Sequence, residues 1–528
     1  MVLEELAIAW AAVGVSWLRM AAALFLSVGF SLLVGGVAAL NKRAEKIIIP
    51  LLDVLQSIPI LGFFPLALYG FYTLSPAIGA EAAAIFLIFT SQVWNLTFAV
   101  YESIKVIPAE FIETSKALGL SPWARATKLY IPSTLPRIFV GFVSSWSNGL
   151  YFLVASEIID FGELDVKLFG LGSTMASFAS AGNVTGMAVT LAVLVAAIIL
   201  TDLFVFLPLI HYSGRFKFEA TAVEDSPIIP LSSVFKGRKL VGRLPRIRFP
   251  SPEFMLPRIP LGWLTKRVRF VKTLLYALAI TLLAYLIFLL PLLREIPLQK
   301  LLYGFLERIY TIGPYNIILD VAFSLARVAT AVLFAVAWSI PLAIYLATNR
   351  RAALFTIPII QVAASIPATI TYPIFASLLQ GYDELRTFIL IIMGMQWYVF
   401  FAAYAGMRRV PSEEREVLEL YNIRGLAGLK VLYLPRGIPS IISGCIAATG
   451  GAWNTLVVAE RMKIGGVVAG VKTPGLGKAI SVATEMGDIY SLALLVAVMV
   501  IVIISINKVF WRKLYELATS KLRFPEAT

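Results

Sequence analysis

The sequence predicts an all-α polytopic membrane protein with about 11 transmembrane helices, built as two tandem units in parallel orientation. Three observations lead to this fold class. The composition is too apolar for a water-soluble domain, apolar segments of membrane-spanning length recur along the whole chain, and the two ends of the chain carry copies of one pattern.

The composition sets the class of protein. Of 528 residues, 59% are hydrophobic and 14% are charged, whereas soluble domains carry about 25% charged residues. Only segments that satisfy their own backbone hydrogen bonds are tolerated in lipid, so the apolar segments are predicted to be helices. The single cysteine, Cys445, and single histidine, His211, allow neither an intramolecular disulfide nor a Cys/His metal cluster. No metal site is predicted.

The apolar segments and the basic loops between them define a topology. A helix needs about 20 apolar residues to cross a bilayer. By this criterion the spans lie at about 16–40, 48–70, 81–104, 134–157, 186–211, 271–293, 320–347, 353–379, 385–407, 437–460 and 488–511. Lys and Arg gather in alternate loops, which the positive-inside rule assigns to the cytoplasm. The +14 charge thus lies in the loops of a multi-pass protein of the plasma or inner membrane, and it does not indicate a nucleic-acid partner. The predicted topology has the N-terminus outside and the C-terminus in the cytoplasm.

The most informative feature is an internal duplication. Ser57-Ile58-Pro59 matches Ser365-Ile366-Pro367 at an offset of 308 residues. Further matches at an offset of 303 pair Trp94, Tyr101, Pro108, Glu113, Pro132, Pro136, Gly141 and Glu157 with Trp397, Tyr404, Pro411, Glu416, Pro435, Pro439, Gly444 and Glu460. Gly170-Leu171-Gly172 matches Gly475-Leu476-Gly477 at 305. Repeats of this length indicate two copies of one structural unit.

The duplication fixes the domain organisation. Each copy has five spans, so a direct fusion would invert the second copy. The extra span restores the parity, and both copies then face the same way. The predicted parts are a first unit at 1–212, a basic Pro-rich cytoplasmic linker at 213–270, the extra span at 271–293, an outer loop at 294–319, a second unit at 320–512 and a cytoplasmic tail at 513–528.

Each copy contains one long cytoplasmic loop, at 105–133 and 408–436, with one local pattern. In the first loop Glu113 lies in a short helix that begins after a proline, and Gly119 follows six residues later. A second short helix is predicted to end at Pro132. Asn422 replaces the glycine in the second loop. Glycine and asparagine are the residues that most readily adopt the left-handed conformation at a helix end, so both loops are predicted to form the same helix–turn–helix.

The spacing Glu-x5-Gly-x9-Leu-x-Ile-Pro in the first loop resembles the EAA loop of inner-membrane permeases of binding-protein-dependent ABC importers. The Ser-Ile-Pro motifs and the Gly-Leu-Gly motifs resemble the nitrate/sulfonate/taurine branch of that family. The resemblance implies two tandem type I ABC importer permease (MetI-like) units. It also implies a coupling helix in each loop, which docks on an ATPase subunit through Glu113, Ala117, Gly119, Glu416, Leu420 and Asn422. Where this family usually has two alanines, the chain has Thr114-Ser115 and Val417-Leu418.

The same resemblance implies partners and excludes a chemical role for the chain. The chain shows no phosphate-binding Gly-Lys-Ser/Thr motif that opens a helix after a strand, so it is not predicted to be an enzyme. No cofactor is expected on this chain, and ATP-Mg would bind to two partner ATPase subunits. An extracytoplasmic solute-binding protein would deliver a small-molecule solute, and lipid surrounds the helices. An interfacial helix with no docking partner remains the alternative reading of the two loops.

Polar side chains within the spans are candidates for the solute pathway, because polar groups in lipid-facing positions are costly. These candidates are Gln92, Asn95, Ser144, Ser147, Asn148, Gln396, Thr449 and Asn454. The alternative is that they only bond neighbouring helices. Acidic residues lie mostly near span ends, and neutral donors suit a small anion better than a cation. An ion-coupled secondary transporter with parallel repeats is the second candidate function, and it would favour acids at mid-depth.

Two arginines hold equivalent places near the outer ends of their spans. Arg19 and Arg327 are related by the offset of 308. Each either reaches the lipid headgroups or pairs with an acid such as Glu157 or Glu460. The resemblance favours a structural role for these pairs.

Overall fold

The computed structural model describes residues 2–56, 58–75, 78–158, 168–216, 298–408, 410, 412–423, 426–464 and 467–521. The first half of the chain forms α1 (Val2–Leu40), α2 (Lys42–Gln56), α3 (Ile60–Leu74), α4 (Gly79–Lys105), α5 (Ala109–Ala117), α6 (Pro122–Arg125), α7 (Ile131–Ile158), α8 (Leu171–Ser180), α9 (Val184–Thr201) and α10 (Leu207–Ser213). The predicted extra span at 271–293 and most of the predicted linker lie outside the described residues.

The second half repeats this order. It forms α15 (Pro314–Thr348), α16 (Arg350–Ser365), α17 (Ala368–Leu378), α18 (Asp383–Arg408), α19 (Ser412–Leu420), α20 (Leu426–Gly428), α21 (Leu434–Glu460), α22 (Leu476–Glu485), α23 (Ile489–Ile506) and α24 (Arg512–Lys521). Strands β1 (Arg461–Ile464) and β2 (Val467–Gly470) follow α21, and the segment predicted as an outer loop contains α14 (Leu298–Ile312). A π-helical turn precedes α7 at Ala126–Tyr130 and α21 at Leu429–Tyr433.

The predicted all-helical membrane fold is confirmed, but the count of about 11 spans is not. Among the described residues eight helices are long and apolar enough to cross a membrane, or nine if α16 and α17 form one bent span. The spans predicted at 48–70 and 353–379 are each two helices, and the second pair is bent by 75°. The break follows from the proline of each Ser-Ile-Pro motif. A residue before proline avoids helical angles, and Ile366 is extended with ψ 117°.

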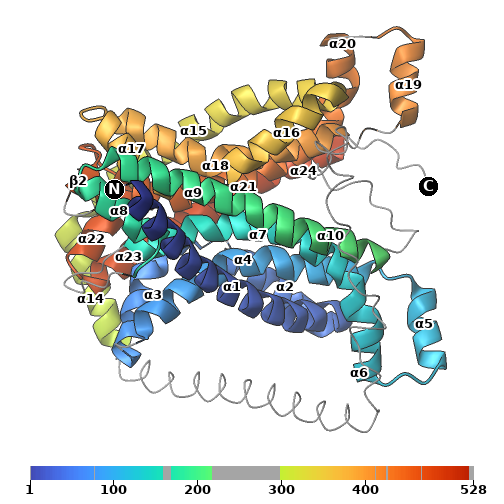
Figure 1. Ribbon diagram of the computed structural model, residues 1–528, viewed down its shortest axis with the longest axis horizontal. Helices are drawn as coiled ribbons and strands as arrows, with labels where there is room; N and C mark the ends of the chain where they lie inside the picture. The colour runs from blue at the N-terminus through green and yellow to red at the C-terminus, as the bar shows by residue number, and fades with distance from the viewer. Residues whose placement is uncertain are drawn as a thin grey trace. The chain divides into compact units, whose positions relative to one another are not determined.

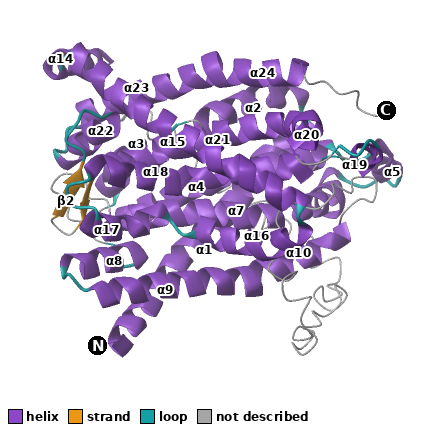
Figure 2. Cartoon of the chain, turned by 90° about the horizontal axis from the view of Figure 1, so that it is seen from above, coloured by secondary structure: helices purple, strands orange, loops and turns teal. Residues whose placement is uncertain are grey.

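Both halves face the same way, as the duplication predicts. Figures 1 and 2 show α5 and α19 at one end of the helices. The hairpin, α8, α17 and α22 lie at the opposite end (Figure 2). The two predicted coupling loops are therefore on the same side.

The most buried helices lie at the centre of the two halves. In α4, α7 and α21 the most apolar stretches are 61%, 56% and 67% buried, against 33% in α1 and 28% in α9 and α15. Within the first half α4 packs against α1 and α7, and in the second half α18 packs against α21. The broken helix of each half crosses to the other half: α3 packs against α21 and α23, and α17 packs against α7 and α8. The boundary between the halves is thus built from both copies in the same way.

Candidate functional site

Both coupling turns adopt the predicted left-handed conformation. Gly119 has φ +65° and Asn422 has φ +53°. The bonds around them also match, since Leu120 N donates to Ser115 O at 3.1 Å and Ile423 N donates to Leu418 O at 2.8 Å. These bonds close the ends of α5 and α19 in the way that left-handed helix termini do.

The six predicted coupling residues are all exposed in the structure. They are Glu113, Ala117, Gly119, Glu416, Leu420 and Asn422. Four residues stand where the family usually has alanine. Ser115 and Leu418 are buried, whereas Thr114 and Val417 are exposed. The exposed surface of the two turns therefore differs in composition although their backbone is the same.

One detail of the predicted loop is wrong. The second short helix does not end at Pro132, because α6 runs through the π-helical turn into α7 without a break. Pro435 sits in the first turn of α21 after the equivalent π-helical turn. Proline is tolerated at a first helical turn because its missing N–H has no helical acceptor there.

A further contact ties α2 to the helix that leads into the first coupling loop. Glu45 accepts hydrogen bonds from Lys105 Nζ at 2.6 Å and from Tyr101 OH at 2.5 Å. The hydrogen bond from Lys105, and then that from Tyr101, lowers the pKa of the Glu45 carboxyl below its usual value. Glu45 therefore remains charged at neutral pH and joins these two helices next to the loop.

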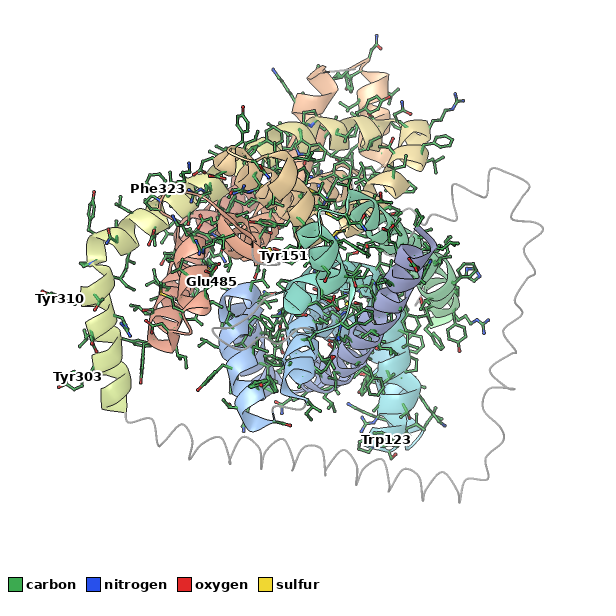
Figure 3. The ribbon with its side chains drawn as sticks, turned by 60° about the vertical axis from the view of Figure 1, so that its left-hand side comes forward. Trp123, Tyr151, Tyr303, Tyr310, Phe323 and Glu485 are labelled. Carbon is green, nitrogen blue, oxygen red and sulfur yellow. The ribbon has the colours of Figure 1, made fainter. Side chains whose placement is uncertain are left out.

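Three of the predicted pathway residues lie on the boundary between the halves. Asn148 Oδ1 accepts from Tyr398 OH at 2.8 Å, and Ser147 Oγ lies 3.0 Å from Ser365 Oγ. Asn454 Oδ1 accepts from Ile60 N at 2.6 Å. Figure 3 labels Tyr151, which lies on α7 one turn beyond this group, and its carbonyl accepts from Thr369 at 3.2 Å. These bonds hold the two halves together along α7 and α21, toward the end opposite to the coupling loops.

The other predicted pathway residues are placed differently. Asn95 and Ser144 are exposed near the middle of α4 and α7, and Gln396 is half-buried. Thr449 is buried and donates to the carbonyl of Cys445 in its own helix at 2.8 Å. The structure thus brings Ser147, Asn148 and Asn454 into hydrogen bonds across the boundary between the halves.

A buried ion-pair cluster lies in the first half, at the end opposite to its coupling loop. Arg19 donates from Nη1 to Glu157 Oε1 at 2.7 Å, and from Nε and Nη2 to the two carboxylate oxygens of Glu81 at 2.6 Å each. Glu157 also accepts from Ser16 Oγ and from Gly172 N at 2.7 Å each. Its side chain is 0% exposed, so all of its charge is compensated within the protein.

The second half repeats this cluster. Arg327 donates to Glu460 Oε1 at 2.6 Å and to both oxygens of Glu384 at 2.9 and 2.7 Å. Glu460 accepts from Ser324 Oγ at 2.7 Å and from Lys478 N at 3.0 Å. Of the two alternatives for Arg19 and Arg327, headgroup contact or pairing with an acid, the structure shows pairing with Glu157 and Glu460.

The repeated glycines fit against these carboxylates. A Cβ atom at Gly170 would lie 2.1 Å from Glu157 Oε1, and one at Gly475 would lie 2.3 Å from Glu460 Oε2. Any side chain would push the carboxylate away from its donors. The Gly-Leu-Gly motif therefore serves close approach of the chain to a buried charge.

Comparison with known proteins identifies the family. Residues 28–209 and 339–514 each match the family described as the binding-protein-dependent transport system inner membrane component, and the two matches cover more than half of the chain. The chain belongs to this family. It is thus a permease of the ABC importer type, with two family units in one chain.

Several relatives of this permease are known by their transport systems. It is 30% identical over 145 residues to the nitrate import permease NrtB of Synechococcus elongatus, covering 28% of this chain and 50% of the relative. It is 31% identical over 147 residues to the bicarbonate transport permease CmpB of Synechocystis sp., covering 28% and 49%. It is 28% identical over 139 residues to the putative aliphatic sulfonates transport permease SsuC of Bacillus subtilis, covering 26% and 50%. The chain spans about half the length of these relatives.

Sequence reasoning missed half of each ion-pair cluster of the permease. Glu81 and Glu384 complete the two arginine sites, and Ser16 and Ser324 support the buried carboxylates. The signal was present in the repeat, because Glu81 and Glu384 are separated by 303 residues and the two serines by 308. A search of the repeat for paired charges would have found them.

Gln92 of the permease is buried inside the first half rather than at the boundary. Its side chain is 0% exposed, and neither its Nε2 nor its Oε1 has a hydrogen-bond partner among the described residues. An unsatisfied buried polar group costs about 1–3 kcal/mol. The structure therefore places the amide of Gln92 in the interior without a hydrogen-bond partner among the described residues.

We expect Gln92→Met to raise the free energy of unfolding of the permease by about 1 kcal/mol or more, because it removes the unsatisfied amide and keeps the side-chain length. Solute uptake should stay unchanged. Denaturant titration in detergent micelles and an uptake assay on the same preparation measure both quantities. Loss of uptake with unchanged stability would instead assign the amide to the solute.

Proposed function

We propose that this permease forms the transmembrane solute pathway of an ATP-driven importer in which separate ATPase subunits act on both coupling loops. The observation that carries the proposal is the pair of equivalent left-handed turns, Gly119 and Asn422, exposed at one end of the helices. A pathway that needed only a pore would have no use for two matched exposed turns on one side.

In this mechanism one ATPase subunit docks on α5 and the other on α19, and ATP-Mg binds to those subunits. Closing of the ATPase subunits brings the two docking sites together. The turns at Gly119 and Asn422 connect α5 and α19 to α6 and α20, and these helices run through a π-helical turn into α7 and α21, so this movement reaches the boundary between the halves. The hydrogen bonds of Ser147, Asn148 and Asn454 across the boundary are then exchanged for contacts with solute. ATP shifts the equilibrium between the two arrangements because the ATPase subunits bind it more tightly in one arrangement than in the other.

The orientation follows from the basic loops, so that the coupling turns face the cytoplasm and the N-terminus lies outside. A solute-binding protein delivers solute to the end that carries the ion-pair clusters. The solute in this proposal is a small anion, because the chain is similar to permeases for nitrate, bicarbonate and aliphatic sulfonates. The boundary offers hydroxyl and amide groups, which coordinate an anion without fixed charge.

Reconstitution tests this proposal. The permease is inserted in proteoliposomes with its ATPase subunits and binding protein, and ATP hydrolysis and uptake of nitrate, bicarbonate and an alkyl sulfonate are measured. We expect one anion to stimulate hydrolysis and to accumulate only with ATP. Uptake that follows an ion gradient in the absence of ATP would overturn the proposal in favour of a secondary transporter.

A further inference from the structure

The β1–β2 hairpin lies at the end of the helices opposite to the coupling loops (Figure 2), and residues 159–167, which correspond to it in the first half, lie outside the described residues. The two strands pair antiparallel, with Arg461 opposite Gly470 and Met462 opposite Ala469. The hairpin begins directly after Glu460, the buried carboxylate of the second ion-pair cluster. Its position is therefore fixed at its base by that cluster.

Three contacts anchor the hairpin to the second half. Arg461 donates to both carboxylate oxygens of Glu485 on α22 at 3.0 and 2.7 Å. Tyr372 of α17, which is 1% exposed, donates its hydroxyl hydrogen to the carbonyl of Ala469 at 2.5 Å. Val471 N donates to Glu460 O at 2.9 Å, which closes the base of the hairpin. The hairpin is thus attached at both strands.

The anchoring side chains are particular to the second half. At the offsets of the duplication, the first half has Phe64 in the place of Tyr372, Ile158 in the place of Arg461, and Ser180 in the place of Glu485. Phe64 and Ile158 carry no side-chain hydrogen-bonding group, and Ser180 carries no charge with which to pair an arginine. The two halves share the ion-pair clusters, whereas the side chains of Tyr372, Arg461 and Glu485 that anchor the hairpin are not repeated in the first half.

The hairpin also reaches the first half, because β1 packs against α8. Met462 of β1 is 5% exposed, so the strand is covered on the side that carries this residue. Tyr372 lies on α17, which itself packs against α7 and α8. The hairpin is therefore bonded to one half and rests on the other.

We propose that this hairpin is a one-sided strap over the boundary between the halves, which stays with the second half and leaves α8 when the pathway opens outward. This inference rests on the proposed function, because it needs two arrangements of the halves. The polar anchors bind the strap to α17 and α22, whereas no hydrogen bond to α8 holds it among the residues described. When the halves separate at this end, the strap therefore loses its contact with α8 before it loses its anchors on α17 and α22.

Cysteine cross-linking tests the strap. In a Cys445→Ala background, Met462→Cys is combined in turn with a cysteine at each position of 171–180 in α8, and the full permease with its ATPase subunits is treated with a short bis-maleimide. We expect at least one pair to cross-link in the resting state. The yield should fall at least about threefold when ATP and vanadate hold the ATPase subunits closed, and the cross-linked protein should lose uptake.

A pair within the second half is the matched control. Met462→Cys with Ala469→Cys joins two directly opposed positions of the hairpin and leaves its anchors in place, and its cross-linking yield should be the same in both states. The strap is refuted if no α8 position cross-links at rest, if the yield is unchanged by ATP and vanadate, or if the cross-linked protein transports normally. These outcomes are distinct from failure of the proposed function, which would appear as absence of ATP-dependent uptake in the protein before cross-linking.

A second variant avoids dependence on cross-linking geometry. Tyr372→Phe installs the residue that the first half carries at the equivalent buried position, so the fold should tolerate it. It removes the hydrogen bond to Ala469. Labelling of a cysteine at the exposed Val468 should become at least about threefold faster than with Tyr372 intact. An unchanged labelling rate would show that this bond does not hold the strap.

Discussion

Replacement of Gly119 by valine is expected to lower ATP-coupled transport by about tenfold while the protein still inserts and folds. Gly119 has φ +65°, a conformation that costs a residue with a side chain about 1–2 kcal/mol, and more for a β-branched one. A cost of about 1.4 kcal/mol changes an equilibrium tenfold. A Cβ at this position would meet no atom within 4 Å, so the effect comes from the backbone alone. Uptake and ATP hydrolysis in proteoliposomes measure the loss.

The two turns of the permease supply matched controls for this result. Gly119→Asn should retain transport, because Asn422 already holds φ +53° at the equivalent position. Asn422→Gly should be tolerated for the same reason, and Asn422→Val should resemble Gly119→Val. Full transport by both valine variants would contradict the coupling role of the turns. Equal losses in the asparagine and valine variants of Gly119 would point to the side chain rather than the backbone.

Replacement of Glu157 by alanine is expected to destabilise the folded permease by about 3–5 kcal/mol, because it leaves the buried Arg19 without one of its partners. The change also removes the acceptor for Ser16 and for Gly172 N. The free energy of unfolding, from denaturant titration in mixed micelles, measures the effect. Glu460→Ala should give a loss of similar size, since Glu460 likewise accepts from an arginine, a serine hydroxyl and one backbone N–H.

An exposed pair of the same charges is the control for this prediction. Glu102 accepts from Arg137 at 2.8 Å, and its side chain is 60% exposed. Exposed ion pairs contribute about 0–1 kcal/mol, so Glu102→Ala should change stability little. Equal losses for Glu102→Ala and Glu157→Ala would mean that burial of the cluster does not determine its contribution.

Much of this fold could be predicted because the same sequence pattern occurs in both halves of the chain. A residue such as Gly119 is weak evidence alone, but Asn422 at the equivalent position identifies the left-handed turn as the shared requirement. The same repetition offered the pairing of Arg19 with Glu157 as one of two alternatives, and the structure shows this pair. Local chemistry and repetition were sufficient for features that lie within one half.

Features that depend on contact between the halves could not be predicted in this way. Polarity alone selected Gln92 and Asn148 equally, yet only Asn148 meets the opposite half, at Tyr398. The spacing of apolar residues along α7 does not indicate which face of this helix packs against the second half. The hairpin at 461–470 was also missed, because its short strands carry no sustained alternation and follow a long helix directly.

The reciprocal packing of α3 and α17 has a consequence for the origin of the chain. Each broken helix completes the neighbouring copy, so the arrangement is that of a twofold homodimer whose subunits have been joined covalently. After fusion the two copies can acquire different residues at equivalent positions. Position 151 offers a backbone carbonyl to Thr369, while its counterpart Asn454 offers an amide oxygen to a backbone N–H. One ancestral interface has thus become two specialised ones.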